Sequence, residues 1–500
     1  MSHESSMPNQ NCHCEPCDEN VSHCLAGIVR PITLDVETLR MIDMRLRIPV
    51  LLFFGTAVFW LILASLLGLI CSLKLVLPSL LDGPAFLTYG RLFPVACDLL
   101  VYGWAIPAAL GAILWIIARL SATSIPCTKI LAPAILLWNL GVFFGSLAVL
   151  SGYSTSVEWL EYPNWASFIL FVSFLLMSIW MVMVLRNRKI RALYVSQWYF
   201  LAALCTFPWL YATANMFLTW GHLQGSAQGP VHAWYASNLM TLWLPLVALG
   251  TSYYLIPRVL GRFIASHYLN LLGFWPFLLF ASWTAMTTLL GGPIPAWMGS
   301  ASVVASFLMI IPVVATILNY HLTMSGNYST IVPSPTLRFV FAGVVFYIIF
   351  NLHALLYAIP SVNAVFHFTD YTIGMNMLSL LGFFSMVMFA AIYYIAPRLL
   401  ELKWPSTCLI KAHFWLTLVG IATMAISTTL GGLIEGIAFE DSAISFTNII
   451  SYSVPWHWLV SLAWMLLLAA NAGFGFLFSW MLWQIKNPTL KQASLEVKIA

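Results

Sequence analysis

Twelve long apolar runs dominate this 500-residue sequence, and they decide what it can fold into. A helix needs roughly 20 apolar residues to cross a bilayer, and each run is long enough for one crossing. The short alternating segments of a membrane β-barrel are not seen. Only 8% of the residues are charged, against about 25% in soluble domains. The sequence therefore predicts an all-α integral membrane protein, a bundle of twelve transmembrane helices in the lipid bilayer. The predicted spans are Leu46–Ile70, Leu92–Arg119, Lys129–Ser151, Asn164–Leu185, Tyr194–Thr219, Val231–Ile256, Tyr268–Leu290, Ala301–His321, Leu337–Ile359, Tyr371–Ile395, Ile410–Leu433 and Val454–Trp483.

The basic residues predict the orientation, because cytoplasmic loops of membrane proteins carry the excess of Lys and Arg. If the N-terminus is inside, all of the 21 basic residues except Lys74 and Arg91 fall on the inner side. An even number of spans then returns the chain to that side, so both termini are expected to be cytoplasmic. The chain divides accordingly into a Cys-rich tail (1–45), a membrane domain (46–485) and a C-terminal tail (486–500).

Charge and motifs exclude several classes of function. A net charge of +4 on 55.8 kDa, with the basic residues dispersed among loops, is not a nucleic-acid footprint. The sequence contains no Walker-type phosphate loop and no dinucleotide fingerprint. A nucleic-acid partner and an ATP-driven pump are therefore not expected.

The N-terminal tail is a candidate metal site. It carries four of the nine cysteines with two interleaved histidines, and thiolates beside imidazole suit zinc or copper(I). The spacing is not a standard zinc-finger pattern, so a tail that binds no metal is the equal alternative. The residues concerned are Cys12, Cys14, Cys17, Cys24, His13 and His23.

Ionisable residues inside the spans are functional candidates, because they are costly in a membrane. Asp98 lies in the second span and is expected either to pair with Arg91 or to relay protons. His353 and His367 lie toward the outer side, near a Met pair at the start of the tenth span, and such a group can hold copper. Packing is the alternative for these histidines.

Several motifs between residues 87 and 436 carry a family resemblance. They include YGRLFP at 89–94, VHAWYASN at 231–238, HFTDYTIG at 367–374 and YYIAPR at 393–398. In these blocks the chain resembles subunit I of the haem-copper oxidases, most closely the cbb-type cytochrome c oxidases. The resemblance implies a respiratory electron-transport protein of the bacterial inner membrane, with haem b and copper as the family cofactors.

The same alignment predicts a degenerate active site. Where the resemblance places histidine ligands of the two haems and of copper, this chain has other side chains, and it has no adjacent His pair and no His-x-His within any span. A functionally important Tyr of the family falls on Ala281, and an important Glu falls on His353. The substituted ligand positions are Ala96, Ser237, Thr287, Thr288, Met375 and Met377.

These substitutions favour a protein without haem or copper in its membrane domain. We therefore expect a non-catalytic subunit, scaffold or assembly partner that associates with other respiratory subunits. One alternative is an active terminal oxidase or nitric oxide reductase whose ligands have moved. Another is a metal-handling or transport protein in which the vacated cavity is a pathway.

Overall fold

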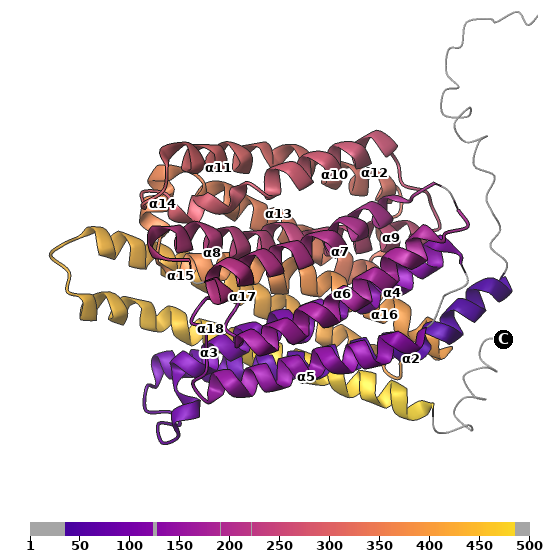
Figure 1. Ribbon diagram of the computed structural model, residues 1–500, viewed down its shortest axis with the longest axis horizontal. Helices are drawn as coiled ribbons and strands as arrows, with labels where there is room; N and C mark the ends of the chain where they lie inside the picture. Colours follow the sequence, from indigo (N-terminus) through magenta and orange to yellow (C-terminus); the bar gives the residue numbers. More distant parts are fainter. Residues whose placement is uncertain (1–35, 124–127, 191, 222, 486–500) are drawn as a thin grey trace, which may run out of the picture.

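The computed structural model describes residues 36–123, 128–190, 192–221 and 223–485. In this part of the chain it has twelve helices long and apolar enough to cross a membrane, and no β-strand. The helices run side by side along the long axis of the molecule (Figure 1). The prediction of an all-α bundle with twelve spans is confirmed. The described chain begins in α2 (Val36–Val76) and ends in α18 (Phe446–Gln484) at the same end of the bundle.

The twelve spans follow in order along the chain. After α2 they are α3 (Tyr89–Asp98) with η2 (Leu99–Ala105) and α4 (Ile106–Ser121); α5 (Leu131–Leu150); α6 (Asn164–Arg186); α7 (Val195–Ala214) with η4 (Asn215–Trp220); α8 (Gln228–Ser237) with η6 (Asn238–Trp243) and α9 (Leu244–Leu260); α10 (His267–Ala281) with η7 (Thr284–Leu289); α11 (Ala296–Leu308) with α12 (Ile310–Met324); α13 (Pro335–Tyr357); α15 (Asp370–Met377) with η9 (Leu378–Ser385) and α16 (Met386–Leu400); α17 (Thr407–Glu440); and α18. The short helix α14 (Pro360–Phe366) connects α13 to α15.

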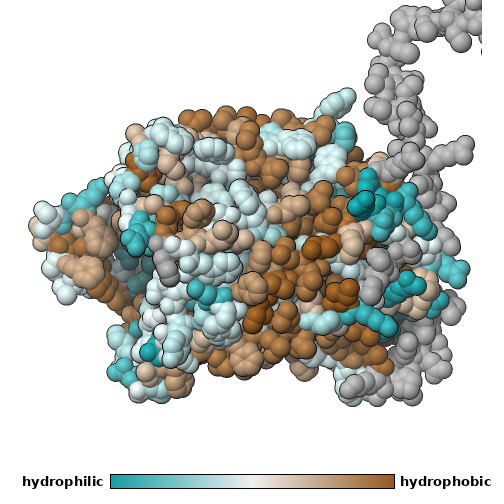
Figure 2. Space-filling view, in the orientation of Figure 1, coloured by the Kyte–Doolittle hydropathy of each residue, from teal (hydrophilic) through white to brown (hydrophobic). Residues whose placement is uncertain are grey.

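The loops between the spans lie at the two ends of the bundle. The segments 77–88, 151–163, 290–295, 358–369 and 441–445 meet at the left of Figure 1, and we call this the Glu158 end. The opposite end, where the described chain starts and finishes, is the Arg258 end. Hydrophobic side chains cover the middle of the face seen in Figure 2, and hydrophilic ones gather toward both ends. This distribution is the one that a bilayer around the bundle requires.

Three spans form the centre of the bundle. In the spans α3–η2–α4, α8–η6–α9 and α15–η9–α16, 100, 94 and 100% of the most apolar window is buried, against 39–50% in the other nine. Each of the three contains a π-helical segment: η2, η6 and η9. Such segments are rare and often lie at functional sites. Here they begin within three residues of Ala96, Ser237 and Met377, which are three of the substituted ligand positions.

Three helices, α2, α17 and α18, extend well beyond their predicted ends. The first starts at Val36 and not at Leu46, so residues 36–45 are helical rather than part of a tail. Within this extension, Asp43 accepts a hydrogen bond from the Trp115 indole at 2.9 Å and pairs with Arg119 at 3.2 Å. Likewise α17 and α18 extend beyond the bilayer-length runs, and the loop expected at 434–453 shrinks to 441–445. Apolar runs predict where a helix is in lipid, but a helix can continue past them.

Candidate functional site

The six substituted positions line two neighbouring cavities. Ser237, Thr287, Thr288 and Met375 lie on a cavity of about 500 Å³, which we call the large cavity. Ala96 and Met377 lie on one of about 80 Å³, the small cavity. Phe93 and Ile373 belong to the walls of both cavities. The six positions that the family resemblance singles out are spread along the sequence, but in the structure they lie around two neighbouring cavities.

Helical geometry explains why the Met pair is divided. Met375 and Met377 are two residues apart on α15, and side chains with that separation point to different faces of a helix. Met375 therefore lies on the large cavity and Met377 on the small one. The two thioethers do not meet in one site.

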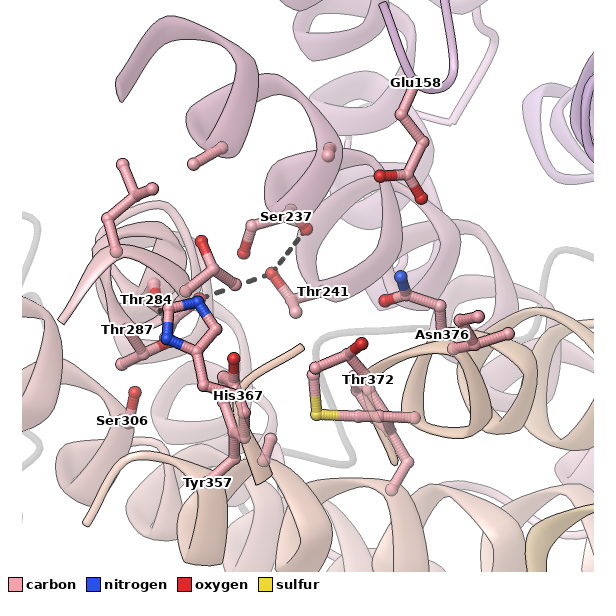
Figure 3. Close-up of a pocket in the computed structure, with 18 of the residues that line it drawn as sticks. Glu158, Ser237, Thr241, Thr284, Thr287, Ser306, Tyr357, His367, Thr372 and Asn376 are labelled. Carbon is pink, nitrogen blue, oxygen red and sulfur yellow. Dashed lines mark hydrogen bonds between the residues drawn. The ribbon is translucent and has the colours of Figure 1, made fainter. Parts of the chain in front are cut away.

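The large cavity has a polar wall. Figure 3 shows hydroxyls of α8, η6 and η7 on one side, the ring of His367 close to Thr284 and Thr287, and the Glu158 carboxylate directed toward Thr241 and Asn376. Its apolar wall consists of Phe93, Leu289, Met309, Phe350, Leu355, Ile373 and Met375. Its size lies in the range of about 300–1,000 Å³ that is typical of small-molecule sites.

The small cavity is closed by tight helix packing. Trp464 of α18 lies against Gly68 of α2, where an added Cβ would come within 2.9 Å of the indole. Thr428 of α17 lies so close to Gly374 that a Cβ there would come within 2.0 Å of the hydroxyl. The rest of the wall combines apolar and sulfur-bearing side chains with a few polar ones. The first group includes Cys71, Cys97, Leu100, Met424 and Val460, and the second consists of Ser72, Tyr89, Asp370 and His457. Its volume is far below that of sites that hold drug-sized ligands.

The structure does not bring together the outer His and Met group expected from the sequence. Both ring nitrogens of His353 are engaged, Nδ1 with the Ile349 carbonyl at 2.9 Å and Nε2 with the Thr429 hydroxyl at 3.0 Å. His353 lies on neither cavity. His367 does line the large cavity and stacks on Phe368, and burial lowers the pKa of its imidazole. The six Cys and His residues of the tail lie outside the described residues.

Two buried carboxyl groups lie beside the large cavity. Asp98 is fully buried and has no hydrogen-bond partner for either oxygen among the described residues. It therefore does not pair with Arg91, whose guanidinium instead donates to the Leu150 carbonyl at 3.0 Å. The neighbour of Asp98 is the carboxyl of Glu161, which is 5% exposed. Burial raises the pKa of Glu161 to about 7.

A third cluster was not anticipated from the sequence. Asp370, Glu435 and His457 each offer a ligand atom, and these atoms lie within 4.8 Å of one another. His457 Nε2 is 2.8 Å from an Asp370 oxygen, and Glu435 accepts hydrogen bonds from the Asp370 backbone N–H and from Ser453. The three residues come from α15, α17 and α18, so no motif spacing could reveal them. The sequence predicted only that all three residues lie close to the ends of predicted spans, on the same side of the membrane.

A comparison with protein families decides the relationship. The family model described as "Cytochrome C and Quinol oxidase polypeptide I" matches residues 48–467, well over half of the chain. The chain belongs to the haem-copper oxidase subunit I family. It is accordingly a multi-pass bacterial membrane protein, as its twelve spans also indicate.

Known proteins agree with this membership. The chain is 26% identical over 411 residues to a cbb3-type cytochrome c oxidase subunit CcoN1 of Stutzerimonas stutzeri, which covers 79% of this chain and 85% of that protein. It is 24% identical over 469 residues to a cytochrome c oxidase subunit 1 of Rhodobacter capsulatus, covering 88% and 86%. A solved haem-copper terminal oxidase dimer superposes with a TM-score of 0.66 at 15% identity, over 89% of this chain and 84% of that one. The last similarity concerns the fold alone.

Proposed function

We propose that this haem-copper oxidase family member is a non-catalytic subunit, scaffold or assembly partner of respiratory complexes that carries neither haem nor copper in its membrane domain. It would lie in the bacterial inner membrane with both termini cytoplasmic, as the distribution of basic residues favours. The names of its relatives describe subunits of oxidases. A surface that docks onto other subunits needs only the preserved bundle.

The observation that carries the proposal is the chemistry of the two cavities. Family cofactors need side-chain ligands that fix their geometry and potential. The small cavity offers the methyl group of Ala96 opposite the thioether of Met377 and is about 80 Å³ in volume, so a haem does not fit. On the large cavity, the hydroxyls of Thr287 and Thr288 each donate to a backbone carbonyl three residues earlier, at 2.9 Å. Neutral hydroxyls are poor copper ligands.

The first experiment is spectroscopic. We would purify the full chain from membranes and record the reduced-minus-oxidised visible spectrum together with iron and copper content. We expect no haem bands and no stoichiometric iron. Stoichiometric haem with oxygen or nitric oxide consumption would overturn the proposal and support relocated ligands, for which His232 and His367 on the large cavity are the available imidazoles.

The second experiment concerns partners. Purification in mild detergent from native membranes, followed by mass spectrometry, should recover other respiratory subunits in constant ratio to this chain. A protein that always purifies alone would contradict the scaffold role.

A metal-handling role is the second candidate, and the Asp370–Glu435–His457 cluster favours it. Metal analysis of the full chain, of a form lacking residues 1–24 and of a His457→Ala variant would locate any bound zinc or copper. If the full chain holds no metal, this second candidate fails while the first stands.

A further inference from the structure

Six of the eight hydroxyl groups on the wall of the large cavity, all except those of Ser237 and Tyr357, donate their hydrogens to backbone carbonyls. Each of a set of Ser and Thr side chains on its wall donates to a carbonyl of its own helical turn, which leaves only oxygen lone pairs for a ligand. The distances are 2.8–3.1 Å for Thr241, Thr284, Thr287, Thr288, Ser306 and Thr372. The Asn351 amide donates one N–H to the Tyr347 carbonyl at 2.8 Å, which leaves its oxygen as a further acceptor beside its second N–H. The wall is thus rich in hydrogen-bond acceptors.

The charge of the wall also favours a ligand that is positively charged. Glu158 lines the cavity, and Figure 3 shows its carboxylate aimed between Thr241 and Asn376. Among the described residues that form the wall, none is Lys or Arg. Burial also lowers the pKa of His367, which disfavours the charged form of that imidazole. A cation entering the cavity therefore meets one formal negative charge and no fixed positive one.

The rest of the wall is suited to the hydrocarbon part of an organic ligand. Phe93, Trp159 and Phe350 line the cavity, and aromatic faces attract cations as well as hydrocarbon. A few N–H groups on the wall have no partner among the described residues, including those of the Trp159 indole and the Asn376 amide, so an acceptor on the ligand can also be satisfied. A bare metal ion would leave most of the 500 Å³ empty.

We propose that the large cavity is a binding site for a small organic cation with a primary ammonium group, whose N–H donors meet the Thr and Ser oxygens and the Glu158 carboxylate. This ligand class goes beyond the scaffold role. It replaces metal coordination at the family's ligand positions by hydrogen-bond recognition of a donor.

The test is a binding titration of n-propylammonium to the full chain in an amine-free detergent, by calorimetry and by thermal shift. Two comparators separate the contributions: tetramethylammonium has the charge without N–H donors, and 1-propanol has the shape without the charge. We expect saturable binding of n-propylammonium, at least tenfold tighter than either comparator. Equal or tighter binding of tetramethylammonium would overturn the donor–acceptor recognition that defines the proposal.

Variants locate the site. Glu158→Gln should weaken n-propylammonium binding about tenfold, and Thr241→Val about threefold. Matched controls are Glu401→Gln, an exposed carboxylate at the Arg258 end, and Thr56→Val, whose hydroxyl donates to its own helix at 2.9 Å but lies on no cavity wall described here.

Both controls should bind like the parent protein. Each variant is first checked for a single gel-filtration peak, and Thr288→Val replaces any that aggregates. No saturable binding in the parent, or unchanged binding in Glu158→Gln and in the Thr variants, would overturn the proposal. Neither result bears on haem content, so the scaffold role is judged separately.

Discussion

The two cavities lie on different faces of α15 and differ about sixfold in volume, although the family resemblance predicts that both have lost histidine ligands. The small cavity has mostly apolar and sulfur-bearing side chains beside Asp370 and His457, and its Trp464 and Thr428 pack closely against two glycines. The large cavity has hydroxyl, amide and carboxylate groups, which need a polar partner and so resist closure. Apolar walls can collapse onto a lost cofactor, whereas polar walls keep a space that something polar must fill.

Introducing histidines at the predicted ligand positions should give the largest difference in stability between the two cavities. The double variant Ala96→His/Met377→His forces two more imidazoles into about 80 Å³, beside a wall whose Asp370 and His457 are already paired with each other. Overpacking and unpaired polar groups should lower the free energy of unfolding by about 4 kcal/mol, with no haem bound. Fluorescence-detected gel filtration during a thermal ramp measures the loss.

The matched control for that variant is the triple change Ser237→His/Thr287→His/Thr288→His on the large cavity. It should fold nearly as well as the parent and bind copper, because the space for side chains and ion is present. If the double variant folds normally and takes up haem, the small cavity is not collapsed.

A second prediction concerns the glycine that lets the small cavity close. Gly374→Val places a branched side chain where even a Cβ comes within 2.0 Å of the Thr428 hydroxyl. Moving α15 away from α17 should cost about 3 kcal/mol. Gly229→Ala on the wall-forming helix α8 is the control, since its nearest neighbour is 3.9 Å from an added Cβ. Equal melting temperatures for the two variants would refute the tight closure.

The third prediction uses the carboxyl group beside the large cavity. Glu161 has a pKa of about 7 when folded and an ordinary value of 4.5 when unfolded. Between these values the folded state binds more protons, so stability falls as the pH rises, and the loss is complete above pH 7. Between pH 5 and pH 8 the parent should lose on the order of 2 kcal/mol that Glu161→Gln retains.

Chemical unfolding at both pH values measures that difference, with Glu401→Gln as the control at an exposed site. A parent protein whose stability does not fall over this range would show that Glu161 is solvated.

The sequence predicted the part of this molecule that follows from local rules. Apolar length predicted all twelve spans. The motifs led to Ala96, Ser237 and the other positions that line the two cavities, and the loss of metal ligands at these positions stays a prediction. What could not be predicted depends on side chains from distant helices. The small volume of one cavity depends on Trp464 and Thr428, and the Asp370–Glu435–His457 cluster joins residues of three helices, α15, α17 and α18. Of the two roles expected for Asp98, the pairing with Arg91 was wrong, because the Arg91 guanidinium donates to the Leu150 backbone carbonyl.

The smallest expected effect tests the polar wall itself. Thr287→Val keeps the shape of the side chain and removes a hydroxyl that donates only to the Thr284 carbonyl of its own turn. Stability should change by less than about 0.5 kcal/mol, because that carbonyl keeps its place in the helix. The same change at Thr428, packed against Gly374 at the small cavity, should cost more than 1 kcal/mol, because its γ atoms have no room to adjust. Chemical unfolding of the two variants side by side measures the contrast, and equal costs would mean that the walls do not differ in how tightly they pack.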